Sequence, residues 1–164
     1  MKERNDKIYS IVLLAISLAF YLFFAFYDGA IICADSPSYI EMSISREFLY
    51  SALLAVFRIV FGEVYLLMVV VLQSLLAAYA AWNVTIYVRK QFSLGYFLST
   101  VVFMIPIFVS LMNRFIAGRG SMYSNSILTE GITIPLFLVF FRYLYDYLVN
   151  HTKRSFVIAL SLWA

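Results

Sequence analysis

The sequence predicts an all-α fold, a polytopic transmembrane helix bundle in a single domain over residues 1–164, with interfacial helices in its first external loop. Charged residues make up 13% of the chain and apolar residues 64%, whereas soluble domains carry about 25% charged residues. Several apolar stretches reach the roughly 20 residues that a helix needs to cross the hydrocarbon core. Phe and Tyr, which suit bilayer interiors and interfaces, dominate an aromatic share of 19%.

The expected spans are residues 8–27, 64–88, 96–113 and 127–148. The first contains no charged residue and is longer than the apolar region of a signal peptide, about 7–15 residues, so we expect a retained helix. Pro106 is expected to kink the third span. An incomplete fifth apolar run, from Phe156 to Ala164, is too short to cross a bilayer. We therefore expect the chain to be the N-terminal portion of a longer protein.

The distribution of Lys and Arg predicts the orientation of the spans, because cytoplasmic loops are enriched in both. On one side the basic residues are Lys2, Arg4, Lys7, Arg89, Lys90, Arg142, Lys153 and Arg154. On the other side they are Arg46, Arg58, Arg114 and Arg119. This bias predicts a multi-pass protein of the cell membrane with a cytoplasmic N-terminus and external loops at residues 28–63 and 114–126.

The run of residues 48–61 is apolar except for Arg58 and is short for a span. We expect an interfacial or re-entrant helix that lies against the bundle. The alternative is that this run crosses the bilayer, which would move every later loop to the opposite side.

Composition also limits the partners. The basic residues are scattered although the net charge is +3, which argues against a nucleic-acid partner. Cys33 is the single cysteine, so an internal disulfide and a metal site of several thiolates are excluded. Membrane lipids are the partners that this composition predicts.

The first external loop carries the first candidate residue. Ser36 is a favoured N-cap and Pro37 suits the first helical position, so we expect a helix from Pro37 to about Arg46. Asp35 would then lie just before the helix N-terminus, where the helix dipole stabilises a carboxylate. Two interpretations stay open: Asp35 helps to cap an interfacial helix, or it is a functional carboxylate.

The second external loop and the fourth span carry further candidates. Glu130 stands near the external end of that span, where an ionisable group is costly and is a functional candidate. Its alternative role is an interfacial residue paired with Arg114 or Arg119. Arg119 lies between two glycines and could bring a guanidinium group to a phosphate. The alternative for this loop is a flexible connection with incidental charge.

Four stretches together resemble a known family. The acid followed by SPSY at residues 35–39 resembles the D-S-x-x-Y loop that follows the first transmembrane helix of GT-C-type glycosyltransferases. REFLYSALLAVFRIVFGE resembles their juxtamembrane helix, and VLQSLLAAYAAWNVTIYVRKQF resembles their second span, with its central Gln and basic end. SNSILTEGITIPLFLVFF resembles the external segment that leads into their fourth span. The family includes dolichyl-phosphate mannosyltransferases and bacterial aminoarabinose transferases, and usually has more spans and a soluble C-terminal domain.

The resemblance implies an integral-membrane enzyme that moves a sugar from a polyprenyl-phosphate donor to an extracytoplasmic acceptor, which is a cell-envelope glycan, a lipid or a protein. It implies that Asp35 is the catalytic base or orients the acceptor, with Glu130 as the second catalytic candidate. Tyr39 would orient the acceptor or Asp35, and Arg114 and Arg119 would bind substrate. In some family members carboxylates of these loops approach a divalent metal ion, which would make Asp35 and Glu130 its candidate ligands.

Two other classes of protein fit the same hydrophobicity. A transporter or flippase would place ionisable groups or broken helices near the bilayer midplane, whereas Asp35 and Glu130 are expected at the external edge. A non-catalytic membrane scaffold would tolerate replacement of both acids.

Overall fold

The computed structural model describes residues 2–43, 48–116 and 120–163. Within these ranges the chain is helical and contains no strand. The elements are α1 (Lys2–Asp28), α2 (Ser36–Ile40), α3 (Phe48–Phe61), η1 (Gly62–Val64), α4 (Tyr65–Gln91), α5 (Tyr96–Ile116), η2 (Tyr123–Asn125), α6 (Glu130–Asn150) and α7 (Lys153–Trp163). The predicted all-α class is therefore confirmed for the described part of the chain.

Four helical segments are long and apolar enough to cross a membrane. They are Glu3–Asp28, Phe48–Gln91, Tyr96–Ile116 and Glu130–Asn150. Each of the four expected spans overlaps one of them, which agrees with a membrane protein. The fourth was expected from residue 127, but its helix begins at Glu130, because the backbone of Ile127 bonds to Ile31 instead.

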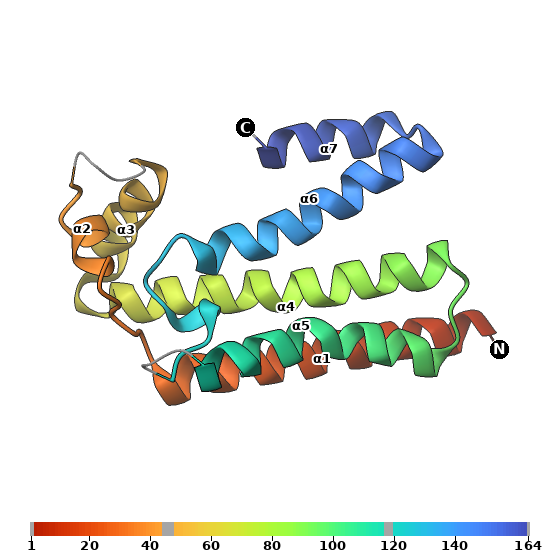
Figure 1. Cartoon of the computed structure of the whole chain (residues 1–164), viewed down its shortest axis with the longest axis horizontal. Helices are drawn as coiled ribbons and strands as arrows, with labels where there is room; N and C mark the ends of the chain where they lie inside the picture. The colour runs from red at the N-terminus through yellow and green to blue at the C-terminus, as the bar shows by residue number, and fades with distance from the viewer. Residues whose placement is uncertain (1, 44–47, 117–119, 164) are drawn as a thin grey trace.

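Helix α4 is the centre of the bundle, packing against α1, α3, α5 and α6 (Figure 1). Small side chains on α4 allow this, since helices in membranes approach closely where Ala, Gly or Ser lies between them. Ala78, Ala80 and Ala81 are almost fully buried. Helix α7 folds back along α6 and packs against it (Figure 1).

Helix α3 lies at one end of α4, beside α2, instead of running on from α4 in a line (Figure 1). The chain turns at Gly62, whose φ of +58° is a left-handed conformation that a glycine adopts without strain. With 14 residues α3 is about 21 Å long, shorter than the roughly 30 Å hydrocarbon core. This geometry suits the interfacial or re-entrant helix, and its position in a bilayer stays a prediction.

The ends of the long helices and the connections between them lie at the two ends of the bundle. At one end Arg89 forms an ion pair of 2.7 Å with Asp6, and the Tyr96 hydroxyl donates to the same carboxylate at 2.7 Å. These contacts hold the N-terminal turn of α1 beside the connection between α4 and α5. The loops that carry the candidate residues lie at the other end. The topology and orientation that the basic residues predict stay predictions.

Candidate functional site

Two loops that are far apart in the sequence are joined at the end of the bundle where α2 and α3 lie. The Ile31 amide donates to the Asn125 carbonyl at 2.9 Å, and the Ile127 amide donates to the Ile31 carbonyl at 3.1 Å. Ile31 and Ser126 form an isolated parallel bridge. The segment after α1 is thereby fixed to the segment before α6, so the loop of Asp35 and the approach to Glu130 form one structure.

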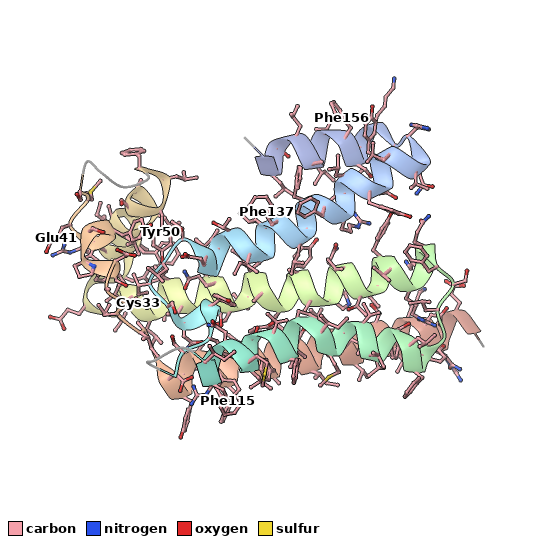
Figure 2. The ribbon with its side chains drawn as sticks, in the orientation of Figure 1. Cys33, Glu41, Tyr50, Phe115, Phe137 and Phe156 are labelled. Atoms are coloured by element: carbon pink, nitrogen blue, oxygen red, sulfur yellow. The ribbon has the colours of Figure 1, made fainter. Side chains whose placement is uncertain are left out.

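Ser36 provides a second connection between these loops. It is fully buried; its hydroxyl donates to the Ile127 carbonyl at 2.8 Å and accepts from the Cys33 amide at 2.8 Å. The serine that was expected to cap a helix therefore bridges the two loops. Figure 2 shows Cys33, Glu41 and Tyr50 at this same end.

Asn125 anchors the second loop to the end of α1. Its side-chain amide donates to the carbonyls of Phe24, at 2.8 Å, and Gly29, at 3.1 Å, and the residue is fully buried. Non-helical backbone is tolerated at membrane depth only where protein groups satisfy it. Asn125 meets that requirement, and the sequence reasoning missed it. The signal that could have indicated it is the polar run Ser124–Ser126 directly before an apolar span.

Asp35 lies at the N-cap position of α2, and its side chain is exposed. Helix α2 was expected over residues 37–46, but it is shorter and ends at Ile40, because Met42 adopts a left-handed conformation with φ of 54°. Residues 44–47 lie outside the described part of the chain. None of the described backbone N–H groups of α2 donates a capping hydrogen bond to the Asp35 side chain. The exposed carboxylate lies at the joined loops.

Glu130 is the first residue of α6, and its side chain is exposed as well. The helix dipole favours an ionised carboxylate in the first turn of a helix. Glu130 also lies within electrostatic range of the Tyr50 hydroxyl, as do Cys33 and Tyr39. The second candidate carboxylate thus belongs to the same end of the bundle as the first loop.

Tyr39 is buried, with 8% of its surface exposed, and its ring packs edge-to-face on Tyr50 with centroids 5.3 Å apart. Such aromatic pairs prefer this geometry. A side chain so deeply buried holds α2 against α3. A direct contact of Tyr39 with an acceptor stays a prediction.

Arg114 forms an ion pair with Asp28, which the sequence analysis did not anticipate. The same guanidinium nitrogen donates to the Gly120 carbonyl at 3.0 Å, and the guanidinium carbon lies 5.0 Å from the centroid of the Phe24 ring. Arg114 therefore closes the second loop onto the end of α1, and its ion pair is with Asp28 rather than with Glu130, the partner that the alternative role of Glu130 allowed. Arg119 lies outside the described residues.

Over residues 2–43, 48–116 and 120–163, no three His, Cys, Asp or Glu side chains lie together as a metal site requires. Asp35 and Glu130 stay candidate ligands, as the resemblance implies, because Mg²⁺ is commonly bound by one or two carboxylates together with water and substrate phosphates. We assign no step of the chemistry to a metal ion.

An apolar cavity of about 310 Å³ opens between α4, α5 and α6. Its lining includes Ala77, Ala80 and Ala81 of α4, and Tyr123 and Ser124 of the second loop also belong to it. Its size is near the lower limit for small-molecule pockets, which span about 300–1,000 Å³. The cavity therefore borders the second of the joined loops.

Replacing Asn125 with Leu is expected to loosen the joined loops without unfolding the bundle. The substitution keeps the volume of the side chain but removes its two hydrogen bonds. Of the two carbonyls that lose a donor, that of Gly29 lies outside regular helix. We expect the free energy of unfolding to fall by about 1–3 kcal/mol. The rate at which a maleimide labels Cys33, which is partly buried, should rise. Asn150→Leu is the matched control, because Asn150 is exposed and bonds within its own helix at the other end. Equal labelling of all three proteins would contradict the anchoring role.

Comparison with known proteins adds no relative: no family model, no curated protein and no solved structure matches this chain.

Proposed function

We propose that the chain is an integral-membrane glycosyltransferase that moves a sugar from a polyprenyl-phosphate donor to an extracytoplasmic acceptor. The observation that carries the proposal is the joining of two loops that present two exposed carboxylates, Asp35 and Glu130, at one end of a helical bundle. The resemblance of both loops to those of GT-C-type enzymes supports it. A donor with a lipid tail reaches such an end from within the bilayer, and a soluble acceptor reaches it from the water.

In the proposed reaction Asp35 takes the proton from an acceptor hydroxyl as its oxygen attacks the anomeric carbon of the sugar. The new carbon–oxygen bond forms with inversion, while the bond between the anomeric carbon and the phosphate oxygen breaks. Polyprenyl phosphate leaves with the electron pair. A positioned general base of this kind contributes about 10²–10⁴-fold to the rate. Glu130 is the second carboxylate, placed to orient the acceptor or to take over the proton.

The apolar cavity supports a lipid-linked donor in particular. Its lining is almost entirely apolar, and it is bounded by the second loop, which contains Tyr123 and Ser124. An isoprenoid chain in this cavity would hold the phosphate and sugar of the donor near the joined loops. Arg114 forms an ion pair with Asp28 in the free protein, so it would have to leave Asp28 in order to bind the donor phosphate as proposed. Arg119 is the second proposed phosphate ligand.

The test uses membranes from cells that produce the chain, with membranes lacking it as the control. A panel of radiolabelled polyprenyl-phosphate sugars is supplied, and label is followed into glycan, lipid and protein fractions. The proposal expects transfer from at least one donor. Movement of an intact donor across the membrane without cleavage would instead favour a flippase, and neither transfer nor movement would favour a scaffold.

The orientation has a separate test that uses the single cysteine. Cys33 lies in the first loop, so the proposal expects a membrane-impermeant maleimide to label it from outside intact cells. Labelling only after the cytoplasmic side is opened would place the joined loops in the cytoplasm and contradict an extracytoplasmic reaction.

A further inference from the structure

Gln73 of α4 is fully buried and reaches both halves of the joined loops. Its amide nitrogen donates to the Tyr50 hydroxyl at 3.0 Å and to the Leu128 carbonyl at 3.3 Å. Tyr50 packs on Tyr39 of the Asp35 loop, and Leu128 lies two residues before Glu130. One side chain is therefore bonded to the supports of both candidate carboxylates.

The contact with α6 is close enough to fix the amide in place. Gly131 follows Glu130, and a Cβ atom added there would lie 2.6 Å from the Gln73 side-chain carbon Cδ and 2.9 Å from the Tyr123 carbonyl oxygen. The Gln73 amide thus occupies the space that any larger residue at position 131 would need. Its position is set by α3, by the second loop and by α6 together.

The hydrogen bonds of Gln73 reach other elements of the fold and leave one of its two amide atoms unpaired within the described part of the chain. Its amide nitrogen is fully used, but the Oε1 oxygen has no hydrogen-bond partner among the described residues. A buried acceptor left unpaired costs about 1–3 kcal/mol, and an apolar side chain of the same volume would avoid that cost. The amide group therefore has a cost in stability, and its two hydrogen bonds are what an apolar side chain could not provide.

We propose that Gln73 is a positioning residue that sets the separation between the Asp35 loop and Glu130 through its bonds to Tyr50 and Leu128. The catalytic meaning of that separation rests on the proposed transferase function. The separation itself is a property of the fold and can be measured without any reaction.

The first measurement is therefore a distance. Nitroxide spin labels are attached to Asp35→Cys and Glu130→Cys in a Cys33→Ser background, and their separation is measured by electron paramagnetic resonance in the folded fraction after gel filtration. Gln73→Met and Tyr50→Phe should each shift or broaden the distance distribution. Tyr50→Phe keeps the ring that packs on Tyr39 and removes only the oxygen, so it also covers the case in which Gln73→Met fails to fold.

Asn83→Leu is the matched control. Asn83 is a polar residue of the same helix, but its amide donates to Tyr79 one turn away within α4. This variant should leave the distance distribution unchanged. A distribution that is the same in Gln73→Met, Tyr50→Phe and the parent protein would overturn the proposal.

The second measurement is the rate of sugar transfer per folded molecule, with the native residues at positions 33, 35 and 130. Misplacement of a catalytic group by about 1 Å lowers the reaction rate by about 10²-fold. Gln73→Met and Tyr50→Phe should therefore each lower the transfer rate by that order. The double variant should lower it little further, because both substitutions remove the same hydrogen bond. A changed distance with an unchanged rate would overturn the catalytic role. A changed distance in a protein that shows no transfer at all would keep the coupling and reject the transferase function instead.

Discussion

Replacing Asp35 with Asn is expected to lower sugar transfer by about 10²–10⁴-fold, the usual contribution of a general base. Asn has nearly the same shape and cannot accept the proton of the acceptor hydroxyl. Asp35 is exposed, so the fold should tolerate the change. The measurement is the initial rate of transfer from the active donor at matched protein levels.

The control for this substitution is Glu41→Gln, which neutralises an exposed carboxylate at the other end of α2. It should leave the rate within about twofold of the wild type, since an exposed group away from the chemistry has little effect. Full transfer by Asp35→Asn would remove Asp35 from the chemistry and leave it as part of the helix start. An equal loss in both variants would indicate a general effect of surface charge.

Replacing Gly131 with Ala is expected to destabilise the protein by about 1–3 kcal/mol, and Leu by more, because overpacking a filled interior forces side chains and backbone to shift. The added Cβ would lie 2.6 Å from the Gln73 Cδ atom and 2.9 Å from the Tyr123 carbonyl oxygen. The measurement is the free energy of unfolding, or the thermal midpoint, in detergent.

Gly95→Ala serves as the control for the glycine substitution, because a Cβ at position 95 has nothing within 4 Å. It should change the stability by less than about 0.5 kcal/mol. A double variant, Gly131→Ala with Gln73→Ala, should recover part of the loss, since shortening Gln73 removes one of the two obstacles. Equal stability of Gly131→Ala and the wild type would contradict the close packing of α6 on α4.

The membrane helices could be predicted from the sequence because the bilayer imposes a simple requirement. Every backbone group in the hydrocarbon core has to be satisfied within the segment, so long apolar runs become helices whatever surrounds them. For that reason the span expected over residues 96–113 agrees with the observed helix α5, Tyr96–Ile116. The shorter elements depend on tertiary contacts: the helix expected to run from Pro37 to Arg46 ends at Ile40, and Ser36 bonds to the second loop instead of serving as its N-cap.

The candidate site was predictable only in part, for the same reason. Asp35 and Glu130 stand out locally, as charges beside apolar runs. The contacts that bring their loops together join residues about 90 or more positions apart, such as Ser36 with Ile127 and Asn125 with Phe24, and no local pattern encodes such a pairing. Arg114 pairs with Asp28 in the folded chain, a contact that no local pattern indicated, and its contact with a substrate stays a prediction.

The most direct measurement uses the purified chain in lipid vesicles, with the donor that is active in membranes and its acceptor. Transferred sugar and released polyprenyl phosphate are counted in the same sample. The account predicts one molecule of each per reaction, dependent on the acceptor and lost in Asp35→Asn. Folded protein that produces neither from any donor of the panel, or that moves the donor across the bilayer intact, would contradict it.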